Sequence, residues 1–584
     1  MSAISTSLPA FERLRSVAER VWERIDRSML RLQGRLDTPS YDRWLPYGFA
    51  IVQITVLITL VLARFHQLDH GVETAKYAQA AWQIGEDLKP VTTLAGGNLI
   101  AEQGSLILYP LGLLTSVLPR IETLLIIKSI ALGLTIIPLW RLARRHGLLG
   151  IGATSTIVFA YSIYTYVHNM NVADFAPAVL AVPALMWAVL SGFDAKPDRT
   201  MQQNYDHQVR PRAKRIMTLA IIFALCCRAD LGLAVAGLGV LLLIERRRRA
   251  GLIALLVGLC WFVVAMYGLQ RGLSDGAFPF LEPYAEFGDT PLGALWGILS
   301  HPVRFTQIVG TQANFQILVT LLAPVLFLPL TAPRYLMPAI PLYVLYMGAD
   351  VPPGRIREAA QTVPMTVFVF VATVFALKRT GRILVKQVRV ERRIILALLL
   401  TAIVFFVRDS STTPYTEPWQ WGGRDETDLA RVDAIELIPI DEPVRASVSM
   451  LPLLAERLGV YELDFSIGEF NGEDPDISIP LGDRLNDVIA EVTSDVDWLL
   501  VDRDLESVEG LEGQIDTFRV RLGELGWELQ SENPGLDRIE VYNFTGIIGA
   551  VPVAQEEPVD LFGFGQIDEV EVGDGAEGSQ DADG

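Results

Sequence analysis

Several groups of polar residues stand at the ends of long apolar runs, where a charged side chain is costly unless it is paired or wet. The first group lies in FHQLDHGVETAKYAQAAW, which directly follows the first apolar run. Asp69, Glu73 and Tyr77 recur there at four-residue spacing, which places them on one face of a helix. A carboxylate held in this way can act as a general base. The alternative is an interfacial amphipathic helix with a solvated acidic face.

The same stretch continues with Gln79 and Trp82 further along. A second polar group follows and contains Asn98, Glu102, Gln103 and Ser105. It leads into the apolar run 105–119, which is shorter than the ~20 residues that a membrane span needs. We therefore expect this run to be re-entrant or interfacial.

Two more polar groups interrupt later apolar runs. In HNMNVADFAP, Asp174 has two interpretations: a residue that starts a helix by accepting bonds from free N–H groups, or a functional carboxylate. In CCRADLGL, Arg228 and Asp230 stand between two apolar segments. Arg228 can pair with Asp230 or Asp174, or it can bind an anionic phosphate. The spacing does not choose between these roles.

Other chemistries lack their usual sequence signals. The three cysteines, Cys226, Cys227 and Cys260, stand inside apolar runs, so they build neither a disulfide framework nor a CxxC zinc pair. The histidines form no HExxH pattern. Without a P-loop, GxSxG or kinase signature, nucleotide-driven transport and serine hydrolysis find no support. No metal ligand is predicted and no cofactor is identified, with a divalent cation left as an option.

The elements that must position these residues are apolar segments near the length of a membrane span. We expect an α-helical polytopic membrane protein with about 11 transmembrane helices. The segments are 46–65, 121–140, 148–167, 172–191, 214–228, 231–244, 251–270, 316–331, 334–349, 363–378 and 394–408. The predicted bundle therefore covers 46–408, with long outer loops at 66–120 and 271–315.

The charges of the loops predict the orientation. Four loops, 141–147, 192–215, 245–250 and 378–393, carry 3, 6, 4 and 7 Lys/Arg against 0, 3, 1 and 1 acids. The segments 66–104 and 271–315 carry 2 basic residues each, against 5 and 4 acids. Because cytoplasmic loops are the basic ones, the first set is predicted to lie inside. We expect a multi-pass protein of the cell membrane with a cytoplasmic N-terminus.

The composition divides the chain into unlike parts. It is 51% hydrophobic and yet carries a net charge of −18, which fits an apolar part and an acidic part in series. The acidic excess follows residue 408 and gives no support for a nucleic-acid partner. Residues 409–554 alternate short apolar stretches with helical pieces and predict a soluble, extracytoplasmic α/β domain. Residues 555–584, with ten acids and no Lys or Arg, predict a disordered tail, and residues 1–45 predict a cytoplasmic amphipathic arm.

The stretch GGNLIAEQGSLILYPLGLLTSVLPRIETLLIIKSIALGLTIIPLWRLARRHG (96–147) resembles a widespread prokaryotic family of multi-pass membrane proteins that carries a domain-of-unknown-function label. ADFAP, RADLGL, PRYLMPAIPL and VRASVSMLPLLAERLGVYEL follow in the family's order, so that the resemblance covers most of 60–505. The family looks like a distant branch of the type C glycosyltransferase superfamily. Those enzymes take a sugar from a polyprenyl-phosphate donor and use a carboxylate of the first outer loop.

The resemblance implies roles for particular residues. The catalytic carboxylate is matched by Glu73 or Asp69, and the substrate-binding positions by Tyr77, Gln79, Trp82, Glu102, Gln103, Asp174, Arg228 and Asp230. Three family residues, two histidines and one glutamate, are replaced by Gln103, Ala176 and Ala229. Groups that could bind metal or carry protons are thus depleted.

On this basis the leading hypothesis is transfer of a sugar from a polyprenyl-phosphate donor at the outer face. Glu73 or Asp69 would deprotonate the acceptor hydroxyl, Arg228 would neutralise the leaving phosphate, and Asp174 would orient it or bind a divalent cation. The alternatives are a transporter or flippase of a polar or lipid-linked substrate, and a non-catalytic scaffold, which the lost histidines keep open. The charges gather at one face and no inverted repeat is visible, which ranks transport lower. Membrane lipids are expected partners; the sugar, the acceptor and the oligomeric state are not predicted.

Overall fold

A computed structural model describes ten stretches of the 584-residue chain. They are residues 38–87, 89–195, 209–274, 276–349, 362–384, 387–413, 422–463, 481–503, 515–532 and 539–546. Most of the predicted N-terminal arm and the whole of the predicted acidic tail lie outside these residues, so neither expectation is tested.

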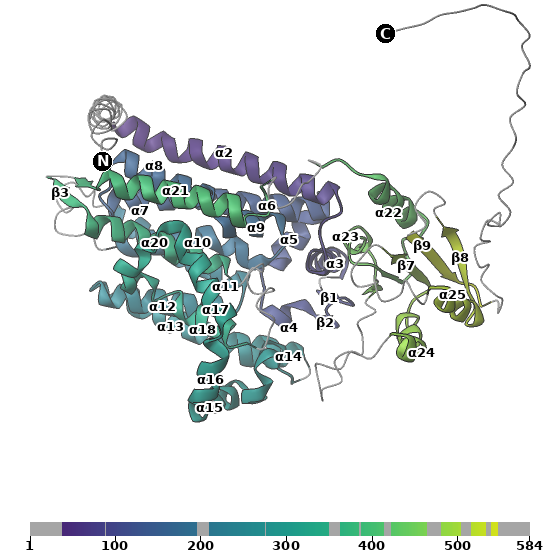
Figure 1. Cartoon of the computed structure of the whole chain (residues 1–584). Helices are drawn as coiled ribbons and strands as arrows, with labels where there is room; N and C mark the ends of the chain where they lie inside the picture. Colours follow the sequence, from purple (N-terminus) through teal and green to yellow (C-terminus); the bar gives the residue numbers. More distant parts are fainter. Residues whose placement is uncertain are drawn as a thin grey trace, which may run out of the picture.

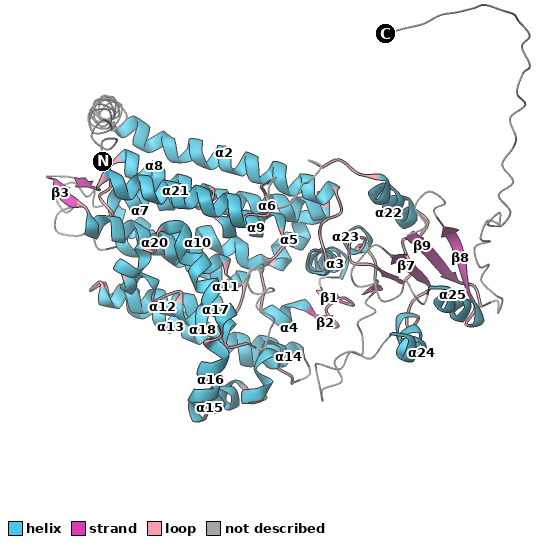
Figure 2. Ribbon diagram, viewed as in Figure 1, coloured by secondary structure: helices cyan, strands magenta, loops and turns pink. Residues whose placement is uncertain are grey.

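The described part of 46–408 is almost entirely helical (Figure 2). The first half contains α2 (Pro39–His66), α3 (Val72–Asp87), α4 (Leu99–Gln103), α5 (Leu108–Thr115), α6 (Arg120–Leu134), α7 (Ile136–Arg145), α8 (Ile151–Ser162), α9 (Thr165–Val172), the short η1 (Pro177–Leu180) and α10 (Ala181–Asp194). The second half contains α11 (Val209–Cys227), α12 (Leu231–Ile244), α13 (Arg248–Val264), η3 (Ala265–Gln270), α14 (Arg271–Leu273), η4 (Pro279–Phe287), α15 (Pro291–Ser300), α16 (Pro302–Val309), α17 (Gln312–Leu322), η5 (Ala323–Val325), η6 (Leu328–Thr331), η7 (Pro333–Leu336), α18 (Ile340–Met347), α20 (Val363–Thr380) and α21 (Arg392–Asp409).

The structure does not confirm eleven spans. Among the described residues, five helices are long and apolar enough to cross a membrane, and a sixth is added if the bent pair α16–α17 is one span. The five are Pro39–His66, Arg120–Arg145, Pro177–Asp194, Arg248–Leu273 and Val363–Thr380. Apolar composition marks a segment without showing where its helix breaks. The segments 316–331 and 334–349 contain several prolines, which end α17 and leave the short turns η5 to η7 before the eight-residue α18.

Two of the bundle's helices approach closely because glycines line their contact. A Cβ at Gly232 of α12 would stand 2.7 Å from the carbonyl oxygen of Gly258 in α13. A Cβ at Gly251 of α13 would meet the carbonyl oxygen of Gly239 at 2.8 Å. Small residues that let backbones touch are the usual packing device of membrane helices.

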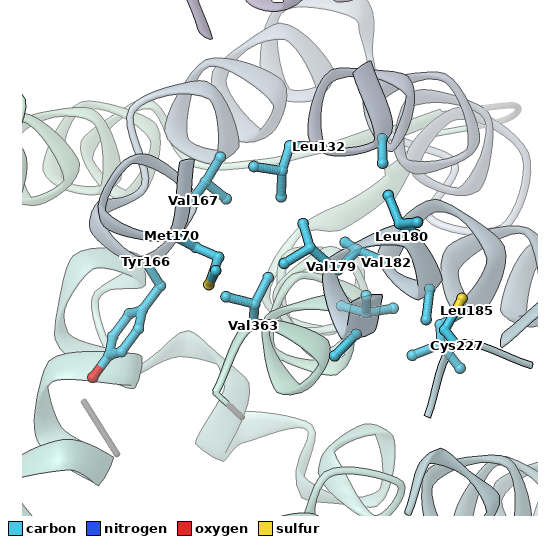
Figure 3. Close-up of a cluster of buried hydrophobic side chains, with 14 of the residues drawn as sticks. Leu132, Tyr166, Val167, Met170, Val179, Leu180, Val182, Leu185, Cys227 and Val363 are labelled. Atoms are coloured by element: carbon cyan, nitrogen blue, oxygen red, sulfur yellow. The ribbon is translucent and has the colours of Figure 1, made fainter. Parts of the chain in front are cut away.

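The bundle's interior is a continuous apolar core (Figure 3). Side chains of α6, α9, η1, α10, α11 and α20 meet there, among them Leu132, Val167, Val179, Leu185 and Val363. The turn 173–176 joins α9 to η1, so this core fixes the position of Asp174.

The first outer loop, predicted at 66–120, is folded. It contains α3, the two-stranded hairpin of β1 (Val91–Thr92) and β2 (Gly97–Asn98), α4 and α5. α5 has only eight residues, which agrees with the expectation that the run 105–119 does not span. The second, 271–315, holds α14, η4, α15 and α16.

The C-terminal part forms the expected small α/β unit, with a five-stranded sheet of order β6-β5-β7-β9-β8. Its elements are α22 (Glu426–Glu436), β5 (Val444–Ala446), α23 (Leu451–Leu454), β6 (Val460–Glu462), α24 (Leu481–Val492), β7 (Trp498–Asp502), α25 (Ile515–Glu524), β8 (Trp527–Glu532) and β9 (Ile539–Phe544). β5 pairs in parallel with β6 and β7, and β9 pairs antiparallel with β7 and β8. The boundaries 409 and 554 stay predictions.

This sheet lies beyond the end of the bundle where α2 stops, and the hairpin of β3 (Arg382–Leu384) and β4 (Gln387–Arg389) lies at the opposite end (Figure 1). One face of the sheet, with Val444, Ala446 and Leu500, belongs to the same apolar cluster as the membrane helices. The other face packs under α24 and α25 around Leu499 and Phe518. The C-terminal unit is therefore seated on the end of the bundle and contacts the first outer loop.

Candidate functional site

Asp174 caps a helix, but not the one that follows it in sequence. Its Oδ1 accepts hydrogen bonds from the backbone N–H of Gly71 and from Thr74 Oγ1, both at 2.7 Å, at the start of α3. Thr74 Oγ1 in turn accepts from the N–H of Phe175 at 3.0 Å. Asp174 therefore accepts hydrogen bonds from free donors at a helix start, as one of its two interpretations held. The helix is α3, which carries Glu73.

Two buried groups surround this cap. Lys128 Nζ, fully buried in α6, donates to the carbonyl oxygen of Ala173 at 2.5 Å and lies 3.4 Å from that of Asp174. His70 Nδ1 lies 3.7 Å from Asp174 Oδ1. Burial would raise the pKa of Asp174, but its contacts with His70, Thr74 and Gly71 outweigh this and lower it.

Glu73 lies in the first turn of α3 and forms a charged cluster with the end of α4. Lys76 Nζ lies 2.9 Å from Glu73 Oε1 and 3.8 Å from Glu102 Oε2, so one ammonium group stands between two carboxylates. Gln103 Nε2 donates to Glu102 Oε1 at 3.3 Å, and Tyr77 OH donates to Gln103 Oε1 at 2.7 Å. We call Glu73, Lys76, Tyr77, Glu102 and Gln103 the carboxylate cluster.

Burial raises the pKa of Glu73, and Lys76 opposes the rise. Because 46% of the Glu73 side chain is still exposed, we expect the rise to be modest. A carboxylate with a raised pKa that is open to solvent on one side is a stronger base than an ordinary glutamate.

Arg228 and Asp230 adjoin this cluster and are paired with each other. Arg228 Nε and Nη2 donate to the two carboxylate oxygens of Asp230 at 2.7 and 2.8 Å, and both residues contact the hydroxyl of Tyr346. The backbone N–H of Ala229 donates to the carbonyl oxygen of Gln103 at 3.0 Å. A Cβ at Gly104 (φ +68°) would stand 2.8 Å from the Cβ of Ala229, so only glycine allows this close approach. The second and fourth polar groups of the sequence, which contain Gln103 and Arg228, are thus brought side by side.

The remaining predicted site residues lie elsewhere. Asp69 pairs with Arg64, Oδ2 to Nη1 at 2.9 Å, and is 43% exposed. Gln79 is fully buried, and its Nε2 donates to Thr93 Oγ1 at 3.0 Å and to the carbonyl oxygen of Arg457 at 3.1 Å. Its bonds hold the C-terminal unit on α3. Trp82 is half-buried further along the same helix.

A family model described as "Predicted membrane protein (DUF2079)" matches residues 73–536, which include the carboxylate cluster and most of the C-terminal sheet. The chain belongs to this family. The resemblance seen in the sequence is confirmed to that extent. No curated protein sequence matches the chain.

Among solved structures, this DUF2079 protein is similar to ArnT from Cupriavidus metallidurans. Its apo crystal structure gives a TM-score of 0.48 at 10% identity over 87% of this chain and 99% of ArnT. The structure bound to undecaprenyl phosphate gives 0.49 at 11% identity over 88% and 100%. At these scores the activity of the DUF2079 chain has to be argued from its own residues.

Three residues of the DUF2079 site were missed by the sequence reasoning. Lys128 was detectable, because it is a lone charge within the apolar run LLIIKSIALGL and such residues are rarely without a partner. Lys76 was detectable as the residue three places after Glu73. Tyr346 gave no signal, since an aromatic residue in an apolar helix is ordinarily packing. Within the described residues, no three His, Cys, Asp or Glu side chains group as a metal site would require.

Proposed function

We propose that this protein is a membrane glycosyltransferase that takes a sugar from a polyprenyl-phosphate donor and carries out the transfer at the carboxylate cluster. The observation that carries the proposal is the junction between this cluster and the Arg228–Asp230 pair. It brings a candidate base and a candidate phosphate-binding cation together at one end of the bundle. A lipid-linked donor requires no nucleotide-binding loop, and the sequence has no such motif.

Glu73 is the better candidate for the base. Asp69 is engaged by Arg64 and lies on the loop before α3, whereas Glu73 lies on the capped helix beside the rest of the cluster. In the reaction, the acceptor hydroxyl gives its proton to the Glu73 carboxylate while its oxygen bonds to the anomeric carbon of the sugar. The bond between that carbon and the phosphate oxygen breaks, and its electron pair leaves with the phosphate.

Arg228 would balance the charge that develops on the leaving phosphate. Its contacts with Asp230 and Tyr346 use Nε and Nη2, which leaves Nη1 for a phosphate oxygen. Asp174 acts by positioning, because its Oδ1 accepts the two hydrogen bonds at the start of α3. We therefore assign Asp174 neither of its two expected roles, orienting the phosphate or binding a divalent cation.

The cluster would lie at the outer face of the cell membrane. In support, the basic loops 141–147 and 378–393 meet at the opposite end of the bundle. There Lys378 Nζ donates to the carbonyl oxygen of His146 at 2.8 Å, and Val388 N–H donates to that of Leu148 at 2.7 Å. Under the positive-inside rule this end is cytoplasmic. The C-terminal unit is then extracytoplasmic.

The test is transfer of label from a panel of radiolabelled polyprenyl-phosphate sugars, in membranes that contain the wild type, Arg228→Ala or the matched control Arg215→Ala. Arg215 is exposed on α11, away from the cluster. We expect transfer by the wild type and the control, and a loss of about 10²-fold or more in Arg228→Ala. If no donor gives more transfer than is measured in membranes without the protein, the enzyme proposal is wrong. The protein would then be a transporter or a scaffold.

A further inference from the structure

A hollow of about 620 Å³ opens at the end of α13, among elements that pack on α4. It is formed by the last turns of that helix and by the loop that follows, with Tyr267, Arg271, Phe278, Glu282, Asp289 and Thr290 among its lining residues. None of these was singled out by the sequence. α13 itself is only 22% buried over its apolar window, so the hollow lies where a membrane-exposed helix ends.

The helix changes its geometry at this point. Residues Ala265–Gln270 form a π-helix, a rare conformation that is often found at functional sites. The change widens the turn that carries Tyr267 and leads into Arg271. Gly276, which also lines the hollow, has φ +94° and no atom within 4 Å of a built Cβ, so the loop turns there without filling the space.

The hollow is tied to the carboxylate cluster. Gln270, fully buried at the end of the π-helix, donates through Nε2 to the carbonyl oxygen of Glu102 at 3.1 Å. Its other side-chain atom, Oε1, is buried without a hydrogen-bond partner, a costly state that calls for a donor. α4 also packs on α14 and η4, and Figure 1 shows α4 and α14 next to each other. Only α4 therefore lies between the elements that form the hollow and α3, the helix that carries Glu73.

The lining residues select one chemical class of ligand. One guanidinium against two carboxylates disfavours an anionic phosphate, and the guanidinium also disfavours a cation. A purely apolar chain would take Arg271, Glu282 and Asp289 out of water without offering them a hydrogen bond. A polyol suits all of them, because each hydroxyl both donates and accepts hydrogen bonds.

Aromatic rings complete this pattern. Tyr267 and Phe278 stand edge to face with centroids 5.6 Å apart, and the Arg271 guanidinium lies 6.0 Å from the Phe278 ring. The Tyr267 ring is 38% exposed, so part of it is free to pack against the C–H face of a sugar ring.

We propose that this hollow binds the acceptor and that the acceptor is a neutral carbohydrate. The inference rests on the proposed glycosyl transfer and adds the acceptor's class and site. Tyr267 packs against the ring, Arg271 and Asp289 bind its hydroxyls, and Gln270 joins the site to Glu102. The acceptor hydroxyl that loses its proton to Glu73 belongs to this carbohydrate or to a unit linked to it.

The experiment is saturation-transfer NMR on the full-length protein in lipid nanodiscs, without donor, with maltose, cellobiose, lactose and diacetylchitobiose as probes. We expect ring-proton signals for at least one probe with the wild type and with Tyr267→Phe, and weakening by about tenfold in Tyr267→Ala and Asp289→Asn. Trp296→Ala is the matched control, because Trp296 is a 72% exposed aromatic residue of the next helix that does not line the hollow. It should bind as the wild type does.

The proposal is overturned if no probe gives a signal, or if Tyr267→Ala binds as well as Tyr267→Phe. Its failure is distinguishable from that of the glycosyl transfer. Binding at the hollow with no transfer from any donor would contradict only the transfer. Transfer with an unchanged acceptor KM in Tyr267→Ala would contradict only the acceptor site.

Discussion

At the scale of the residue, the site depends on one ammonium group between two carboxylates. Lys76 contacts Glu73 and Glu102. Burial raises the pKa of Glu73, and the positive charge of Lys76 limits that rise. Lys76 therefore sets the pH at which Glu73 can take a proton. Its removal should show in a pH profile even if the fold is unchanged.

We predict that transfer falls as the pH drops through the raised pKa of Glu73, because only the ionised carboxylate can accept a proton. The acid limb of kcat/KM should lie above the ordinary glutamate pKa of ~4.3. In Lys76→Met the limb should move to still higher pH, since the opposing positive charge is gone. A pH–rate series on both proteins measures this, and an acid limb that stays in place in Lys76→Met would show that Glu73 is not the titrating group.

Spacing placed Asp69, Glu73 and Tyr77 on one helix face. The structure brings Glu73 and Tyr77 together in the cluster, but Asp69 precedes α3, so that part of the prediction was wrong. Spacing could not separate Glu73 from Asp69, because the difference is made by Arg64, whose contact depends on how α2 ends. Capping was one of the two interpretations of Asp174, and the helix start that it caps lies about a hundred residues earlier in the chain. Long-range partners of this kind are decided by packing, which a single sequence does not show.

At the scale of the element, α3 is held by a cap that comes from another part of the chain. Asp174 binds Gly71 and Thr74 at its start, and the same Thr74 hydroxyl accepts from Phe175. The helix that carries Glu73 is thus fixed to the turn between α9 and η1. The apolar core beneath that turn (Figure 3) makes the anchor rigid.

We predict that Thr74→Val lowers stability by about 1–3 kcal/mol, because the Asp174 carboxylate and the Phe175 N–H each lose a buried partner. Transfer should fall as well, since Glu73 moves with α3. Thr74→Ser keeps the hydroxyl and should restore both properties. Thermal unfolding in detergent and initial rates measure the two effects, and equal behaviour of the valine and serine variants would contradict a positioning role for the cap.

The elements themselves were predicted unevenly. The apolar runs marked α2, α6 and α20 well. The runs at 316–331 and 334–349 were predicted as spans, but they fold as the end of α17, the short turns η5 to η7 and the short helix α18. Hydropathy records how apolar a segment is, but prolines and hydrogen bonding decide how long its helix is. The parallel strands β5, β6 and β7 followed from short apolar stretches with helical pieces between them, although their order in the sheet did not.

At the scale of the whole molecule, the C-terminal unit and the membrane bundle share one apolar core and a set of polar contacts. Thr93 Oγ1, on the hairpin loop, donates to the carbonyl oxygen of Val460 at 2.5 Å and accepts from the Val460 N–H at 3.0 Å. Gln79 binds the residues just before this strand. The edge strand β6 is thereby covered by the first outer loop, which protects its open edge.

We predict that Thr93→Val speeds hydrogen exchange of the Val460 amide, because that N–H loses its acceptor. A loss of about 1 kcal/mol corresponds to roughly fivefold faster exchange. Thr93→Ser should exchange as the wild type does. Exchange followed by mass spectrometry of the peptide that spans β6 measures this, and protection that persists in Thr93→Val would mean that the contact does not hold the unit in place.

The orientation of the molecule is also open to test. In a variant without Cys226, Cys227 and Cys260, we predict that Ser300→Cys reacts with a membrane-impermeant maleimide on intact cells. Arg382→Cys, in the hairpin at the basic end, should react only after the membrane is permeabilised, because basic loops stay inside. The reverse pattern would place the carboxylate cluster in the cytoplasm and contradict the proposed site of reaction.

The central claim is that Glu73 accepts the proton during glycosyl transfer. Its most direct test is the single-turnover rate of sugar transfer by purified protein in lipid, with the best donor from the panel, for Glu73→Gln beside Glu86→Gln, which alters an exposed carboxylate on the same helix. We predict a fall of about 10²- to 10⁴-fold for Glu73→Gln and no change for Glu86→Gln. A Glu73→Gln protein that transfers at the wild-type rate would contradict the account.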